Sequence, residues 1–144
     1  MMRTLLMLVL SFTLLNTTRA ADDAELGRMQ GKWEVKKTNE EGQKITQTIE
    51  IKKDKMLFKI LSNAGDTVLV ATADIKPRQL GSFSTFTITN LKYGQSEDSL
   101  NPADEDRSYI YQIGPSTFTI VSDIDEEREQ TPTLDTYKKV RSGK

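Results

Sequence analysis

The chain has 144 residues and a nearly balanced charge, with 20 Lys or Arg, 21 Asp or Glu, and neither His nor Cys. Without these two residue types it cannot build a Ser-His-Asp or Cys-His nucleophile, a His-based zinc site or a disulfide, and its scattered charges form no basic tract. We therefore expect no enzyme, no cofactor, no metal site and no nucleic-acid partner.

The first 20 residues have the features of a secretory signal peptide. Arg3 gives a positive start, residues 5–15 form an apolar run, and Thr18 and Ala20 are the small residues ahead of a cleavage point. The run is shorter than the roughly 20 apolar residues that span a bilayer, which argues against an uncleaved anchor. Cleavage would leave residues 21–144 as one domain, exported to the periplasm or the extracellular space, with no membrane span in the mature chain.

The first half of this domain changes from a helical to a strand pattern. Residues 24–30 predict a short helical turn, with Asp22 and Asp23 at its start. Apolar residues then recur at every second position, which is typical of half-buried strands. This period predicts strands around Trp33 and Val35, over residues 45–51 and over residues 56–60, with a hairpin turn at residues 63–66. Residues 67–75 form a fourth strand whose buried face is ambiguous.

The second half contains four more predicted strands. Residues 76–81 are not expected to be regular strand throughout, because Pro77 has no N–H to donate. The fifth strand covers residues 83–91, and because Phe83 is out of phase with Phe86 and Ile88, a bulge near Ser84 is expected. Later strands and loops follow in chain order: a long polar loop at residues 94–106, then strands over residues 109–113, from residue 118, and over residues 134–141.

Eight short strands without a long helical pattern indicate an all-β domain. The same strands could form a sandwich. We favour a single antiparallel up-and-down β-barrel of about eight strands, because nearly every connection is hairpin-like and closure removes exposed sheet edges. The short N-terminal helical turn would precede the barrel.

Four segments carry a resemblance to a known family. Residues 29–35 with Gly42, residues 75–80, residues 110–114 and residues 137–141 are similar to segments of the lipocalin-like domain family of small exported bacterial proteins, abundant in planctomycetes. The chain departs from that pattern at Gly81 and at residues 130–132, where the family has an Asp and an Arg-Pro pair. The family implies a barrel but no established activity.

The resemblance also implies a structural role for Trp33. In lipocalins a late basic side chain packs over this Trp, and here Arg141 is the first candidate and Lys139 the second, through a cation–π contact. Trp33 and Arg141 would then plug the closed end of the barrel. Any function would lie at the opposite mouth or in the loop of residues 94–106.

Aromatic residues at alternating positions of consecutive strands suggest a ligand site. The expected wall residues of the barrel mouth are Phe58, Phe86, Tyr109, Tyr111 and Phe118, and the expected partner is a small apolar or amphipathic ligand. The alternative is that these residues fill the barrel, which the short chain favours. A filled barrel would instead be a scaffold in the cell envelope that contacts a protein partner through residues 94–106.

Two acidic clusters complete the candidate sites. They are residues 104–106, and Asp123 and Asp125 with Glu126, Glu127 and Glu129. Neither has the Gly and the ligand spacing of a calcium-binding EF-hand loop, so charged hairpin loops are the expected explanation. A carboxylate-dependent enzyme is the third hypothesis for the chain, and it would need two acids that converge in a concave site.

Overall fold

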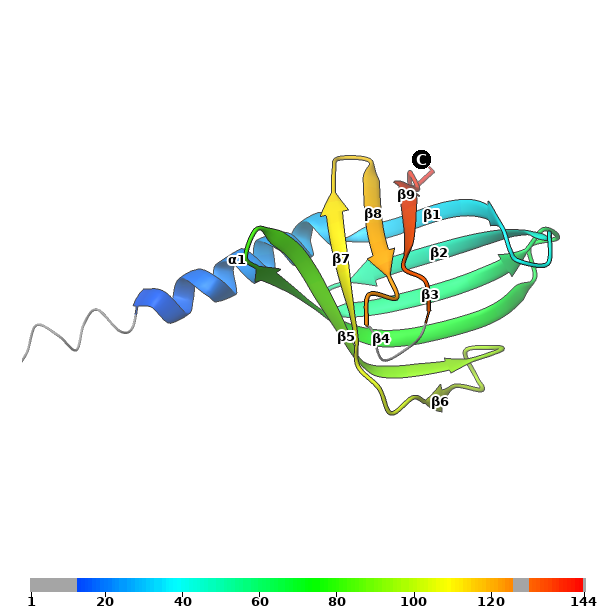
Figure 1. Ribbon diagram of the computed structural model, residues 1–144, viewed down its shortest axis with the longest axis horizontal. Coiled ribbons are helices and arrows are strands. Elements are labelled where there is room, and N and C mark those ends of the chain that lie inside the picture. The colour runs from blue at the N-terminus through cyan, green and yellow to red at the C-terminus, as the bar shows by residue number, and fades with distance from the viewer. Residues whose placement is uncertain (1–12, 126–129, 144) are drawn as a thin grey trace, which may run out of the picture.

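The computed structural model describes residues 13–125 and 130–143, with side chains from residue 20 onward. A helix, α1 (Thr13–Met29), is followed by strands that together form one sheet (Figure 1). The strands are β1 (Gly31–Thr38), β2 (Lys44–Lys52), β3 (Lys55–Ser62), β4 (Thr67–Leu80), β5 (Phe83–Gly94), β6 (Asn101–Pro102), β7 (Arg107–Ile113), β8 (Thr117–Ser122) and β9 (Thr133–Lys139).

The sheet closes into a barrel of eight antiparallel strands. Each long strand pairs with the next long strand along the chain, and β1 pairs with β9. The short β6 pairs only with β5 and adds an extra strand beside the ring. In Figure 1, β7, β8 and β9 cross the layer that β1 to β4 form, so the interior lies between these two groups of strands. The predicted up-and-down barrel is confirmed.

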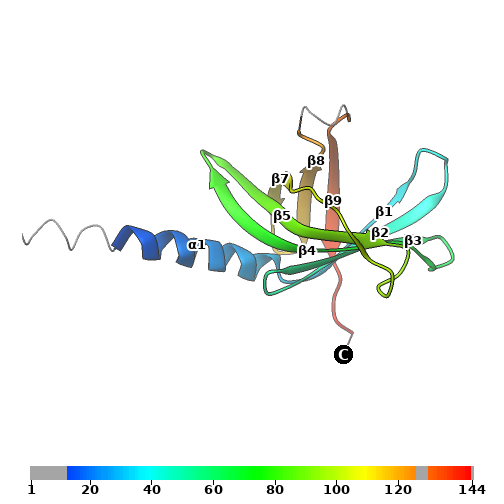
Figure 2. The ribbon, with the colours of Figure 1, turned by 90° about the horizontal axis from the view of Figure 1, so that it is seen from below.

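Helix α1 is longer than the predicted helical turn. It begins at Thr13 in the described chain, so Asp22 and Asp23 lie inside the helix and not at its start. Figures 1 and 2 show it extending away from one end of the barrel. Gly31, with φ of +112°, makes the change of direction into β1. Among the described residues no helix is both long enough and apolar enough to cross a membrane.

The period of two in the sequence places one face of each strand inside the barrel. Trp33 pairs with Ile49, Ile49 with Phe58, and Phe58 with Ala71, so these four residues form one row across β1 to β4. Ile49 and Ala71 are buried, and Phe58 packs against the core cluster. This row settles the face of β4 that its Val- and Ala-rich sequence leaves ambiguous.

Strand β4 continues through Pro77, contrary to the prediction for residues 76–81. The N–H of Ile75 donates to the carbonyl of Asp54 at 2.8 Å, on the side where β3 lies. Backbone amides alternate along a strand, so the nitrogen of Pro77 points to the same side. There the ladder with β3 has already ended at Lys55. The missing N–H of Pro77 therefore breaks no ladder hydrogen bond, and β5 pairs along the other edge to Leu80.

The bulge in β5 lies at the other end of the strand from the predicted one. Ser84 is paired regularly, so the expectation of a bulge there is wrong. The register shifts between Thr72 and Asp74, opposite an extra residue at Asn90, whose φ of +50° is typical of a bulge. The side-chain amide of Asn90 donates to Asp74 at 2.7 Å and holds this conformation. The shift turns Leu91 into the core, out of phase with the first half of β5.

Candidate functional site

The barrel end next to α1 is filled by aromatic side chains. Trp33 and Phe118 have no exposed surface, and their ring centroids are 5.4 Å apart. Tyr111 packs edge-on against Phe118 at 5.8 Å. Met29, the last residue of α1, is fully buried in the same cluster, and the indole N–H of Trp33 donates to its carbonyl at 2.9 Å. Together these four side chains form the packed core at this end of the barrel.

The cation over Trp33 is Lys139, not Arg141. Its ammonium nitrogen lies 5.0 Å from the centre of the indole ring, whereas Arg141 is in the exposed segment after β9. Lys139 is the register partner of Trp33 across the seam between β1 and β9, which fixes this contact. A Cβ on Gly31 would lie 3.3 Å from the Lys139 side chain, so the glycine leaves room for it.

Polar contacts tie α1 to the filled end. The hydroxyl of Tyr111 donates to Glu25 at 2.7 Å, and Arg28 donates both to Glu25 and to the carbonyl of Ile113. The Tyr111 hydrogen bond lowers the pKa of Glu25, against the opposing effect of burial. Burial, with the bond to Glu25, raises the pKa of Tyr111. Burial also raises the pKa of Tyr137, whose hydroxyl donates to Gln47 at 2.9 Å.

Two of the four tyrosines are therefore expected to ionise only well above pH 10. Since Tyr111 and Tyr137 keep their protons in the folded chain and lose them near pH 10 when unfolded, the folded state loses stability as the pH rises past 10. Titration of tyrosinate absorbance should show a late phase from Tyr111 and Tyr137, and Tyr111→Phe should remove one group from this late phase. Ionisation of all four near pH 10 in a folded sample would contradict this assignment.

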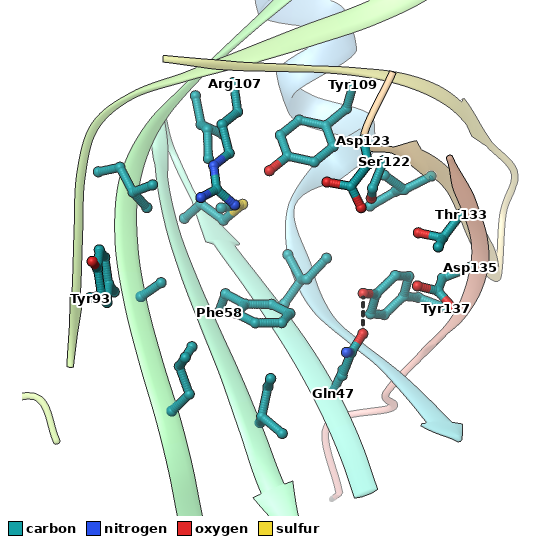
Figure 3. Close-up of a pocket in the computed structure, with 18 of the residues that line it drawn as sticks. Gln47, Phe58, Tyr93, Arg107, Tyr109, Ser122, Asp123, Thr133, Asp135 and Tyr137 are labelled. Atoms are coloured by element: carbon teal, nitrogen blue, oxygen red, sulfur yellow. Dashed lines mark hydrogen bonds between the residues drawn. The ribbon is translucent and has the colours of Figure 1, made fainter. Parts of the chain in front are cut away.

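The other end of the barrel contains a cavity of about 480 Å³ (Figure 3). This volume is within the usual range for small-molecule sites. The expectation of a filled interior is thus correct for one end of the barrel and wrong for the other. Apolar side chains from five strands line most of the cavity, among them Ile49, Met56, Leu69, Ile88, Leu91 and Ile120.

The predicted wall residues divide between the two ends. Phe58, Phe86 and Tyr109 line the cavity, and the rings of Phe86 and Tyr109 stack with centroids 4.8 Å apart. Tyr111 and Phe118 belong instead to the filled end. Alternation along each strand predicts that these five side chains point into the barrel. It does not predict how far along the barrel axis each one lies.

Polar side chains that the sequence prediction missed also line the cavity. Lys37 and Asp135 form an ion pair at 2.8 Å across the seam between β1 and β9. Arg107 enters the cavity from the first position of β7. The period of two could have identified them, because Lys37 continues the parity of Trp33, and Arg107 continues that of Tyr109. Charged residues are mostly exposed in folded proteins, so the pattern alone does not predict that these two side chains face inward.

Arg107 lies two positions before Tyr109 on β7 and therefore on the same face of the strand as one of the two stacked rings. It pairs with Ile88 on β5, next to the pair formed by Tyr109 and Phe86. Its guanidinium donates twice to one carboxylate oxygen of Glu105. Burial acts to lower the pKa of Arg107, but the bonds and charges of Glu105 and Tyr109 outweigh it and raise the pKa. Arg107 is therefore a permanent cation at an apolar wall.

Among the described residues of the long loop and of the acidic clusters, only Asp123 lines the cavity. In the segment of residues 94–106, β6 pairs with β5, and Glu97 forms an ion pair with Lys59 on β3. Glu105 pairs with Arg107. Glu126, Glu127 and Glu129 lie outside the described residues. Within residues 13–125 and 130–143, acidic side chains form no group of three that could hold a metal ion.

No family model matches the chain, and neither the curated proteins nor the solved structures include a match to it.

Proposed function

We propose that this chain is an exported, non-catalytic binding protein, and that its barrel cavity holds a small apolar or amphipathic molecule. The observation that carries the proposal is a cavity of about 480 Å³ with mainly apolar walls and a few polar groups at defined places. Such a composition is typical of small-molecule sites. Export rests on the signal-like first 20 residues, and membership of the lipocalin-like family it resembles is part of the same proposal.

The alternative functions have less support. The scaffold hypothesis was tied to a filled interior, and an open cavity argues against that premise. The enzyme hypothesis needs two convergent acids, and Asp123 and Asp135 both line the cavity. Asp135, however, forms an ion pair with Lys37 at 2.8 Å, so the two acids do not form a pair that is available for acid and base roles.

Filling the cavity tests the proposed function. Ala71 lies beside Phe58 on the inner wall, and its small side chain leaves part of the cavity open. We expect Ala71→Phe to weaken binding of a neutral dye such as N-phenyl-naphthylamine by roughly tenfold or more, since the new ring would occupy the space that the dye needs. Dye emission, which rises in apolar surroundings, measures the binding. Trp33 is a poor reporter because it lies in the filled end.

Thr72→Phe is the matched control. Thr72 is the next residue of β4 and does not line the cavity, so the same ring added there should leave dye affinity unchanged. The proposal fails if the parent chain does not bind the dye, or if both variants bind it as the parent does. Circular dichroism of each variant checks that the barrel has folded.

A further inference from the structure

The polar side chains that line the cavity differ in how much of their hydrogen-bonding capacity is taken up by partners within the protein. Lys37 and Asp135 neutralise each other at 2.8 Å, and Tyr137 donates its proton to Gln47 at 2.9 Å. A ligand would have to break one of these contacts to use them. Arg107 differs, because a guanidinium has five N–H donors. Glu105 takes two of them with a single oxygen atom, and the side chain of Tyr109 also bonds to the guanidinium.

The position of Arg107 is also set firmly. It lies on β7 and pairs with Ile88 of β5, so its backbone is part of the barrel wall and not of a loop. Figure 3 shows its guanidinium and the ring of Tyr109 entering the cavity from the same wall. The two residues are two positions apart on one strand, and therefore share its inner face. The ion pair with Glu105 holds the guanidinium in place from outside the cavity lining.

From this arrangement we infer that the ligand is an amphipath with a carboxylate head, which Arg107 binds with help from the hydroxyl of Tyr109, while its alkyl chain lies on the apolar walls. A planar guanidinium matches the two oxygens of a carboxylate, and such charge-assisted bonds are stronger than neutral ones. The apolar walls beside Arg107 include Met56, Phe58 and Leu91. The inference rests on the proposed function and adds the class of ligand to it.

An amine head is the competing arrangement. Asp123 also lines the cavity, and Figure 3 shows its carboxylate pointing inward. Asp123 follows the last residue of β8 and lies in the connection to β9, so no strand pairing holds it. Sites on strands are more firmly positioned than sites on loops, which favours Arg107 as the anchor.

The test uses three compounds with the same alkyl chain: dodecanoate, dodecanol and dodecylamine. Each is titrated against the full barrel loaded with neutral N-phenyl-naphthylamine, and loss of dye emission reports displacement. We expect dodecanoate to bind about tenfold or more tightly than dodecanol, the range that one charge-assisted bond gives. Dodecylamine should bind no more tightly than the alcohol.

Variants assign this preference to a side chain. Arg107→Gln should reduce the affinity for dodecanoate to that for dodecanol and leave dodecanol unchanged. Because it also leaves Glu105 unpaired, the double variant with Glu105→Gln repeats the test without that charge. Glu105→Gln alone should strengthen dodecanoate binding several-fold, since it removes the carboxylate that competes for Arg107. Lys37→Gln is the matched control, a second lining cation whose loss should keep the preference.

The outcomes separate the two proposals. If the barrel does not bind the dye, the proposed function fails and the inference fails with it. If the dye binds but none of the three compounds displaces it, only the inference is overturned. If all three displace it equally, or the amine binds best, the cavity binds apolar molecules but the inference is overturned. It is also overturned if the carboxylate preference survives in both Arg107 variants, or disappears only in Lys37→Gln.

Discussion

Replacing Trp33 with Ala is expected to lower the free energy of unfolding by about 3–5 kcal/mol. The side chain has no exposed surface and packs against Phe118 with ring centroids 5.4 Å apart. Its removal would leave a large cavity in the filled end and would free the carbonyl of Met29, which now accepts the indole N–H.

Urea denaturation followed by far-UV circular dichroism measures this effect without the tryptophan signal. Leu134→Ala is the control, since Leu134 is 66% exposed on β9 and should change stability by no more than about 0.5 kcal/mol. Trp33→Phe should lie between the two, because a smaller ring keeps part of the packing and loses the hydrogen bond. Equal stability of Trp33→Ala and Leu134→Ala would show that the filled end does not stabilise the fold.

Replacing Gly94 with Ala is expected to destabilise the barrel by about 1–3 kcal/mol, the usual effect of forcing extra atoms into a packed site. A Cβ at Gly94 would lie 2.2 Å from the carbonyl oxygen of Ser99 and 3.0 Å from its carbonyl carbon. Both are backbone atoms and cannot rotate away. Residues 95–100 would have to move, and the pairing of β6 with β5 would be lost.

The control for this change is Gly27→Ala. A Cβ there meets no atom within 4 Å, and Ala has a higher helix propensity than Gly by about 1 kcal/mol, so this variant should be as stable as the parent or more so. Hydrogen exchange should report faster exchange at the backbone amide of Ala103, which donates to Leu91, only in Gly94→Ala. Unchanged exchange there would mean that the segment accommodates the extra methyl group.

The barrel could be predicted from the sequence because the signals for its strands and turns lie within short segments of the chain. Alternation around Trp33, Ile49 and Phe58 and short turns such as residues 63–66 are enough to predict eight strands joined in chain order. The turn at residues 63–66 has the expected form, since Gly65 has φ of +89° and Ser62 bonds with Asp66. Both features depend only on neighbouring residues.

Other features depended on contacts that sequence spacing does not contain. Pro77 is tolerated in β4 because β3 ends before it, and the length of a neighbouring strand is a tertiary property. Lys139, and not Arg141, lies over Trp33 because the register between β1 and β9 pairs Lys139 with Trp33. The parity of β7 could have placed Arg107 inside, but only packing decides that a charged residue stays there.

Closure of the barrel joins the first strand to the last, and this has a consequence for the order of folding. The register of β1 with β9 contains only two paired residues on each strand, led by Trp33 with Lys139. During synthesis, β1 can pair with β9 only after residues more than 100 positions away have been made. A chain that stops before β9 would expose two open sheet edges, which are templates for aggregation. Pairing of β9 with β1 and β8 is therefore the step that covers both open edges and removes this route to self-association.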